Sequence, residues 1–323
     1  MAVRIGFVGT GGIAANHFGN LEKIEDARIV GLYDVAPERA EAAARRSPGS
    51  RAYPSFVDML ESAGLDALYV CVPPHAHQDY EVLAAERGIH LFVEKPISTA
   101  LSRAREVAAA ISEAGVISSV GYNWRYLDTT ARAREIIAGK AIALAQGYWV
   151  GGFPQVSWWR VKEQSGGQAV EQTTHIFDLA RYLLGEVESV YALGFKGLMA
   201  DWPGCDVEDA SAVALRFKSG TVATINSADI APRGGGTIGL QLYSRDLVVS
   251  LMSTRLKVST PLRSEEMLAG VNPYAVEDQT FVEAVKTGDA SAIRSTYADA
   301  VRTLAVTLAV NESIASGRVI SVE

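Results

Sequence analysis

Apolar and polar positions follow one pattern in the first third of the chain and another in the remainder. The first third alternates short, β-rich apolar runs with stretches whose apolar residues recur at helical spacing. This alternation predicts parallel strands joined by covering helices. The predicted strands span residues 3–8, 28–33, 67–72, 89–93 and 116–122. The predicted helices span residues 13–24, 37–46, 78–87 and 101–114.

Beyond about residue 142 the pattern becomes mostly strand-like, with few helices between the strands. The predicted strands span residues 142–150, 187–195, 210–217, 221–228, 237–242 and 247–258. Lys218-Ser219-Gly220 between two of them indicates a hairpin, so we expect a large, mostly antiparallel sheet. The predicted helices span residues 168–184, 275–286 and 295–316. We therefore expect an α/β domain over residues 1–121 and an α+β domain over residues 122–323.

Length and composition agree with two folded domains that act on small molecules. The chain has 323 residues, and a single core usually stops growing at roughly 250–300 residues. Apolar residues make up 48% and charged residues 21%, which argues against intrinsic disorder. Lys and Arg total 30 against 37 Asp and Glu, a formal net charge of −7. This charge argues against nucleic acid or an anionic membrane as the main partner.

The cysteine content and the amino-terminal segment indicate in which cellular compartment the protein is expected. Cys71 and Cys205 are too few for a disulfide framework or a Cys-based zinc site, and Cys71 lies in a predicted buried strand, where it is expected to be a core residue. The apolar stretch after Met1 is too short for a signal peptide, and no window reaches the ~18 apolar residues of a membrane span. We therefore expect a cytoplasmic protein.

A glycine-rich turn follows the first predicted strand and opens the first predicted helix. Its residues match GxGxxA: Gly9, Thr10, Gly11, Gly12, Ile13 and Ala14. Such a turn lets the backbone approach a pyrophosphate, which the partial positive charge of the helix amino terminus then binds. Asp34 ends the second strand about 20 residues later, where a carboxylate takes the ribose hydroxyls. The pattern predicts a Rossmann domain that binds NAD rather than NADP, since Asp34 would repel a 2′-phosphate. Arg39 could offset that repulsion, but an exposed position on the helix is the favoured explanation for it.

Glu94-Lys95-Pro96 lies at the carboxyl end of a predicted parallel strand, the edge where doubly wound sheets bind ligands. Pro96 restricts the backbone of Lys95, whose ammonium can donate a hydrogen bond to a substrate oxygen. A surface ion pair between Glu94 and Lys95 would account for the same residues.

Glu171, His175 and Asp178 lie within the predicted helix 168–184, after Gly166-Gly167. Spacings of four and three residues place them on one helical face, where Glu171 can orient His175 and raise its basicity. A structural histidine fits the same spacing. We expect no metal here, because no additional His or Cys lies nearby in the sequence. His75 and His77 also lack a third metal ligand, so capping or packing roles are favoured for them.

Aromatic side chains and hydrogen-bond donors are expected at the domain junction. They include Asn123 and Arg125 in one segment and Trp158, Trp159 and Arg160 in another. Aromatic faces stack on the C–H faces of a sugar or cyclic polyol, while donors bind its hydroxyls. Packing in the core is the alternative for each of these residues.

Together these residues resemble the Gfo/Idh/MocA family of oxidoreductases, named for glucose–fructose oxidoreductase, inositol dehydrogenase and a rhizopine catabolism protein. The resemblance covers nearly the whole chain. It rests on the motif at Gly9 to Ala14, on Asp34, on Pro73 and His77 after the third strand, on Glu94-Lys95-Pro96, and on Gly166-Gly167 with His175 and Asp178. The lysine–proline motif is the most specific of these.

The resemblance implies a Rossmann domain and a sheet domain that often mediates oligomerisation. Because exposed faces of antiparallel sheets are usually covered, we expect a homodimer or homotetramer. It also implies NAD(P)-dependent hydride transfer on sugars or polyols, with Pro73, His77, Glu94 and Lys95 near the cofactor. Lys95 resembles the catalytic lysine of the family and His175 its catalytic histidine. The family pattern DxGxHxxD is altered here: Glu171 replaces the first Asp and Thr173 replaces Gly.

The expected reaction is oxidation of a secondary alcohol by NAD. His175, oriented by Glu171, would take the hydroxyl proton while Lys95 holds the oxygen, or Lys95 would itself take the proton. The expected substrate-binding residues are Lys95, Asn123, Arg125, Trp159, Glu171 and His175. A redox-assisted, NAD-dependent glycosidase and a non-catalytic, dehydrogenase-like sugar sensor are the alternative functions.

Overall fold

The computed structural model describes residues 2–232 and 234–322, so Met1, Arg233 and Glu323 lie outside the described residues. The described chain divides into two compact units. The first contains residues 1–98, 102–126 and 272–301, and the second contains residues 99–101, 127–271 and 302–323. A single division near Gly121 therefore differs from these units, because a late segment packs with the first one.

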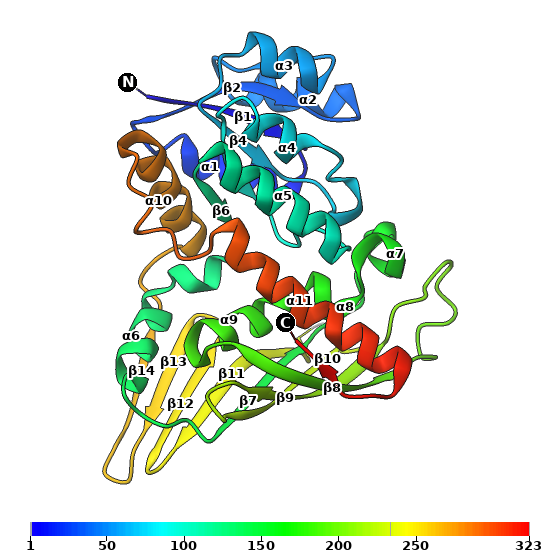
Figure 1. The fold of residues 1–323 in the computed structure, drawn as a ribbon, viewed down its shortest axis with the longest axis vertical. Helices are drawn as coiled ribbons and strands as arrows, with labels where there is room; N and C mark the ends of the chain where they lie inside the picture. Colours follow the sequence, from blue (N-terminus) through cyan, green and yellow to red (C-terminus); the bar gives the residue numbers. More distant parts are fainter. Residues whose placement is uncertain (1, 233, 323) are drawn as a thin grey trace. The chain divides into compact units, whose positions relative to one another are not determined.

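The first unit is built on a six-stranded sheet in which every pair is parallel and whose order is β3-β2-β1-β4-β5-β6 (Figure 1). Its strands are β1 (Val3–Val8), β2 (Ala27–Tyr33), β3 (Arg51–Ala52), β4 (Ala67–Val70), β5 (His90–Val93) and β6 (Ser118–Val120). All four residues of β4 are buried, so both faces of this strand are covered. The predicted parallel α/β architecture is confirmed.

Helices cover this sheet, and one of them comes from late in the chain. They are α1 (Gly12–Leu21), α2 (Pro37–Arg46), α3 (Phe56–Ser62), α4 (Tyr80–Ala85), α5 (Leu101–Ala114) and α10 (Pro273–Thr287), with 3-10 turns η1 (Pro74–Ala76) and η2 (Asn123–Tyr126). Helix α10 packs beside α1 (Figure 1). Its Phe281 ring lies 5.6 Å from the rings of both Tyr69 and Phe92, which stack on each other. This aromatic contact joins α10 to the centre of the first sheet.

The second unit contains a nine-stranded sheet with the order β14-β13-β12-β11-β7-β10-β9-β8-β15. Its strands are β7 (Leu144–Val150), β8 (Val187–Phe195), β9 (Ala210–Phe217), β10 (Val222–Ala228), β11 (Thr237–Ser244), β12 (Leu247–Met252), β13 (Arg255–Ser259), β14 (Ser264–Leu268) and β15 (Ile320–Ser321). Strands β7 and β10 pair in parallel, and the other described pairs are antiparallel. The predicted, mostly antiparallel sheet is confirmed.

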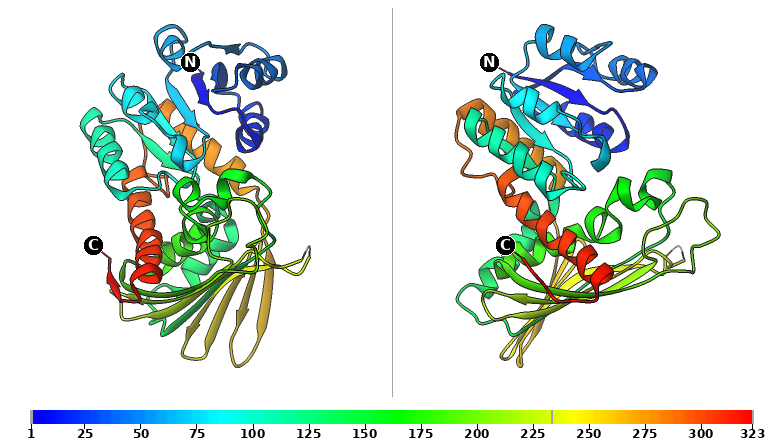
Figure 2. Two further views of the ribbon diagram at one scale, coloured as in Figure 1. Left: turned by 90° about the vertical axis from the view of Figure 1, so that its right-hand side faces the viewer. Right: turned by 45° about the vertical axis from the view of Figure 1, so that its right-hand side comes forward.

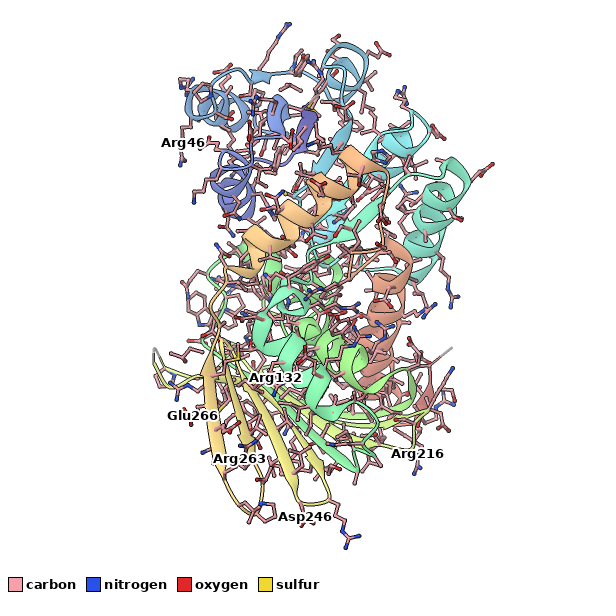
Figure 3. All side chains as sticks on the ribbon, turned by 90° about the vertical axis from the view of Figure 1, so that its left-hand side faces the viewer. Arg46, Arg132, Arg216, Asp246, Arg263 and Glu266 are labelled. Atoms are coloured by element: carbon pink, nitrogen blue, oxygen red, sulfur yellow. The ribbon has the colours of Figure 1, made fainter. Side chains whose placement is uncertain are left out.

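Helices cover one face of this second sheet, as Figure 2 shows. They are α6 (Asp128–Ile137), α7 (Lys162–Ser165), α8 (Gln168–Glu171), α9 (Thr174–Leu184) and α11 (Tyr297–Ser316), with the 3-10 turn η3 (Ser157–Arg160). Along β9 buried and exposed residues alternate, as expected of a strand with one covered face. Asp246 in the β11–β12 turn and Arg263 beside β14 extend from the ends of the strands (Figure 3). Among the described residues, no helix combines the length and apolarity that crossing a membrane requires.

Two predicted elements of the second unit are wrong. Residues 247–258 form a hairpin of β12 and β13 rather than one strand, and Ser253 turns the chain with a φ of 52°. The predicted helix 168–184 is interrupted between α8 and α9, where the N–H of Thr173 bonds the carbonyl of Gln168 across five residues. The interruption separates Glu171 from His175.

Candidate active site

The glycine turn after β1 has the geometry that its sequence predicts. Gly9 has a φ of +82°, and a Cβ there would lie 2.3 Å from the carbonyl oxygen of Cys71, so no larger residue fits. A Cβ on Gly11 or Gly12 would meet nothing within 4 Å, so the space above them is open. Ala14 is fully buried, whereas Ile13 is partly buried against the core. The turn therefore leaves the amino terminus of α1 accessible to a ligand.

Asp34 directly follows β2, and backbone donors hold its side chain. One carboxylate oxygen accepts hydrogen bonds from the N–H and the hydroxyl of Thr10, at 2.9 and 3.0 Å. The other accepts from the N–H of Ala36 at 3.0 Å. The carboxylate is thus fixed beside the glycine turn, although Asp34 and Thr10 are far apart in sequence.

The segment after β4 orients a buried histidine toward an acid on the next helix. Pro73 precedes the η1 turn, and His77 follows it. The Nδ1 of His77 pairs with a carboxylate oxygen of Glu81, which lies in α4 and is fully buried. His77 thus has a packing partner inside the first unit. Cys71, which directly follows β4, is a buried core residue, and burial raises the pKa of its thiol.

Glu94 and Lys95 leave β5 at the carboxyl edge of the first sheet. Glu94 is 5% exposed, and its Oε2 accepts the backbone N–H of Lys95 at 3.1 Å. The Lys95–Pro96 peptide bond is cis. The Glu94 carboxylate is thus buried at this edge rather than exposed at the surface.

Beneath Glu94 lies a buried polar cluster that the sequence analysis did not identify. His17 of α1 bonds Glu94 Oε1 through Nε2 at 3.0 Å and Asp278 Oδ1 of α10 through Nδ1 at 2.7 Å. Asn20 donates to Asp278 Oδ2 at 3.0 Å, and the hydroxyl of Tyr69 donates to Asp278 Oδ1 at 3.2 Å. Two polar residues on the buried face of α1, His17 and Asn20, were the available signal.

Charges in this cluster depend on one another. Burial alone would lower the pKa of His17, but the hydrogen bonds and charges of Asp278 and Glu94 outweigh it and raise the pKa to about 10. Burial, followed by the charge of Glu94, holds the pKa of the adjacent Glu277 carboxyl well above its usual range. Among the described residues, His17, Glu94 and Glu277 are close enough to bind a metal ion. A protonated imidazole has no lone pair for a metal, so this charge state favours a proton instead.

Glu171 and His175 in the second unit flank the break between α8 and α9. The predicted single helical face is therefore wrong: Glu171 ends α8, and His175 lies in the first turn of α9. Both are buried, and the imidazole stacks on the indole of Trp149 with ring centres 5.7 Å apart and an interplanar angle of 21°. Asp178 accepts from the hydroxyl of Thr303 at 2.9 Å, so it has a partner on α11.

A second acidic cluster lies at the end of β10. Asp229 directly follows this strand, and its N–H donates to the carbonyl of Asp209 at 2.9 Å. Both aspartates are buried. Burial, followed by the charge of Asp209, raises the pKa of Asp229 to about 8. Burial thus favours the protonated form of this carboxyl group.

The predicted substrate-binding residues near residue 122 are largely occupied by contacts within the first unit. Arg125 is 3% exposed, and its guanidinium pairs with Asp299 at 2.6 Å and donates to the carbonyl of Arg294 at 2.5 Å. Asn123 is buried in η2, with its side chain near the phenol of Tyr274. These contacts favour the packing alternative for Arg125.

Trp159 belongs to an aromatic pair in η3 of the second unit. Its ring stacks on that of Trp158 at 5.9 Å, and Arg160 lies 4.2 Å over the ring of Trp202. Both indoles are partly exposed.

Comparison with known proteins identifies the family. Residues 3–122 match the GFO/IDH/MocA oxidoreductase family with an NAD-binding Rossmann fold, and residues 131–245 match the GFO/IDH/MocA C-terminal domain. A myo-inositol 2-dehydrogenase of Thermotoga maritima is 30% identical over 237 residues, which are 72% of this chain and 70% of the relative. The chain belongs to the GFO/IDH/MocA family. The resemblance found in the sequence is thereby confirmed.

Other known proteins match the chain over its full length. The inositol 2-dehydrogenase of Rhizobium meliloti is 28% identical over 339 residues and covers 100% of both chains. The WlbA dehydrogenase of Bordetella pertussis, solved with NADH and UDP-GlcNAcA, is 25% identical with a TM-score of 0.87 and covers 100% of this chain and 99% of its own. The protein is thus an oxidoreductase of this family with an NAD(P)-binding Rossmann domain.

The residues of this GFO/IDH/MocA Rossmann domain fit the dinucleotide that the family implies. The first N–H groups of α1 have no partner within the helix, and Gly11 and Gly12 leave the space in front of them open. These groups would bind the pyrophosphate, and Asp34 would bind the ribose hydroxyls.

Proposed function

We propose that this protein oxidises a secondary alcohol of a sugar or cyclic polyol with NAD, or reduces the corresponding ketone with NADH. The observation that carries the proposal is the placement of Lys95 directly after buried Glu94 at the carboxyl edge of an NAD-binding sheet. When bound, NAD supplies the hydride acceptor.

The choice of NAD over NADP rests on Asp34. Its carboxylate is held in place by the N–H groups of Thr10 and Ala36 beside the glycine turn. A fixed negative charge at this position would bind the 2′- and 3′-hydroxyls of a ribose and repel a 2′-phosphate.

We assign complementary roles to Lys95 and His175. Lys95 would donate a hydrogen bond to the substrate oxygen, and His175 would take the hydroxyl proton during oxidation. Stacking on Trp149 restrains the plane of the imidazole, which supports a role that needs a fixed orientation. Glu171 would act beside the start of α9 rather than along the same helical face.

The proposed substrate class rests on the family and on the aromatic surfaces of the second unit. Two relatives, matched over 72% and 100% of this chain, carry names of inositol 2-dehydrogenases. The stacked Trp158 and Trp159 rings provide flat apolar faces of the kind that bind the C–H faces of sugars.

A homo-oligomer is proposed from the uncovered face of the second sheet. Leu193 and Phe195 on β8 are 59% and 54% exposed. Contiguous exposed apolar side chains on a sheet face are typical of a protein interface, and a second copy of this chain would cover them.

The test combines a substrate screen with a lysine variant. NADH formation would be followed by absorbance over inositols, aldoses, amino sugars and dihydrodiols. Lys95→Ala should lower kcat by about 10²–10⁴-fold, the usual contribution of a positioned proton-transfer group, and leave NADH binding by fluorescence nearly unchanged. Lys23→Ala, which changes an exposed lysine of the same unit, is the control.

Two results would reject this proposal. Near-normal turnover of Lys95→Ala would remove the lysine from the chemistry. Release of a sugar from a glycoside with no net NADH would instead identify the redox-assisted glycosidase.

A further inference from the structure

His17 has a carboxylate at each of its two ring nitrogens. Nδ1 lies 2.7 Å from Asp278 and Nε2 lies 3.0 Å from Glu94, and His17 itself is fully buried. An ionised carboxylate accepts hydrogen bonds but cannot donate them. A neutral imidazole carries one N–H, so it can satisfy only one of the two acids. When both acids are ionised, only the doubly protonated imidazolium can donate a hydrogen bond to each of them.

Aromatic rings enclose this imidazolium and keep water away from it. The rings of Phe92 and Tyr69 lie 5.0 and 5.3 Å from the imidazole, and that of Tyr274 lies 6.2 Å away, all in edge contact. A charge in such surroundings is stable only with ionised partners at hydrogen-bonding distance. The titratable groups around His17 come from three segments, namely the end of β4, the residue after β5, and α10; they are Tyr69, Cys71, Glu94, Tyr274, Glu277 and Asp278.

Glu94 connects this cluster to Lys95. Its Oε1 binds His17, and its Oε2 accepts the backbone N–H of Lys95 at 3.1 Å. Gly121 gives the carboxylate room, because a Cβ at that position would lie 2.8 Å from it. His17 of α1 thus holds the Glu94 side chain, and Glu94 in turn fixes the backbone of Lys95, the residue proposed to contact substrate.

We propose that His17 is a positioning residue for Lys95: as an imidazolium bridging Asp278 and Glu94, it keeps the Glu94 carboxylate ionised and directed at the Lys95 backbone. The inference rests on the proposed role of Lys95 in the reaction. It assigns His17 no contact with substrate or cofactor. Asp278, held by Asn20 and Tyr69, serves as the second anchor.

His17→Gln is the variant that tests this role. Glutamine cannot bridge two carboxylates as a cation, so Glu94 loses its charged partner and takes up a proton more readily. We expect kcat to fall by about 10²-fold, as for a misplaced catalytic group, while the KM for NAD changes far less. We also expect kcat/KM of the variant to rise with pH as Glu94 ionises, over a range where the wild type is flat.

Tyr69→Phe is the matched control. It removes a hydrogen bond to Asp278 from the far side of the cluster, keeps the aromatic ring, and leaves both bonds of His17 in place. Its pH profile should follow that of the wild type. A merely structural role for His17 predicts that His17→Gln loses stability without gaining a new ionisation in its pH profile, which would overturn the proposal.

A second measurement does not depend on the folding of a variant. The chain has five histidines, and nitrogen-15 NMR of their side chains distinguishes imidazolium from neutral imidazole. One histidine should keep both N–H protons at pH 8, and Tyr69→Phe should preserve this signal. If all five are neutral at pH 8, the proposal is wrong.

The outcome also separates this inference from the proposed function. If Lys95→Ala keeps its activity, the proposed function fails. If Lys95→Ala is inactive while His17→Gln retains the wild-type kcat and pH profile, only the role of His17 fails.

Discussion

The two buried acidic clusters, one in each unit, hold their charge in different ways. In the first unit, His17 lies between Asp278 and Glu94, and both of these acids accept further hydrogen bonds. In the second, the charged neighbour of Asp229 is another carboxyl group, Asp209, whose effect on the pKa outweighs that of a hydrogen bond with the Gln168 side chain. In the first cluster the two acids thus raise the pKa of the histidine between them, whereas in the second, burial and the charge of Asp209 raise the pKa of Asp229 itself.

This difference shows what a buried carboxylate needs in order to stay ionised. Desolvation penalises the charged form in both units, and only an opposite charge with direct hydrogen bonds outweighs it. Glu277 demonstrates the rule within one cluster, since it is adjacent to Asp278 in sequence but has its pKa raised by burial. Proximity to a charged cluster is thus not enough, and the direct partner decides the charge state.

Asp278→Asn should have the largest effect on stability, because it removes one charged partner of the buried imidazolium. Breaking one side of a buried ion pair usually costs about 3–5 kcal/mol in the free energy of unfolding. Chemical denaturation at pH 7 would measure the loss. Hydrogen exchange of α1 and α10 would locate it in the first unit.

Glu277→Gln is the control, because glutamine resembles a protonated glutamic acid. Its free energy of unfolding should stay within about 0.5 kcal/mol of the wild type at pH 7. Equal losses from the two neighbouring substitutions would contradict the assigned charge states.

The sequence predicts the fold best where local signals end an element. Helices α2 and α5 have the predicted bounds. Pro37 is the first residue of α2, and Gly115 directly follows the last residue of α5. The β12–β13 hairpin turns at Ser253, where no glycine, proline or asparagine marks a turn. The break between α8 and α9 likewise occurs at Gln172 and Thr173, which carry no helix-breaking signal. Tertiary contacts, not local preferences, decide such positions.

The candidate site shows the same division between local and distant information. Gly9, Asp34 and Lys95 could be found because each follows a strand at the edge where such sheets bind ligands. His17 could not, because its partner Asp278 lies 261 residues away on a helix of a different segment. Spacing along the chain reports neighbours on one element and gives no information about such a pair.

Gly121→Ala tests how rigidly the first cluster holds Glu94. A Cβ would lie 2.8 Å from the Glu94 carboxylate, which His17 prevents from moving away. We expect a loss of about 1–3 kcal/mol, as for an overpacked core, by chemical denaturation. Gly19→Ala in α1 meets nothing within 4 Å and should instead stabilise by about 0.5–1 kcal/mol. If the Glu94 side chain is mobile, Gly121→Ala and Gly19→Ala will have similar free energies of unfolding. If His17 holds the Glu94 side chain, the stability lost by Gly121→Ala will be smaller when His17→Gln is also present.

Asp229→Asn should have the smallest effect, and its sign should depend on pH. The pKa of Asp229 is about 8 in the folded protein against an ordinary value of 3.8, so the folded state holds the proton more tightly than the unfolded state does. Wild-type stability from this group is therefore fully present below about pH 4 and is lost as pH rises toward 8. Asparagine is uncharged at every pH, so the variant should be more stable than the wild type at pH 9. We expect its melting temperature to be higher by at least about 2–4 °C, the shift that roughly 1 kcal/mol in the free energy of unfolding produces. The advantage should shrink toward pH 5, and Asp201→Asn at an exposed position should show no such trend. A difference that stays constant with pH would mean that Asp229 is ionised throughout, and the contrast between the two clusters would then be lost.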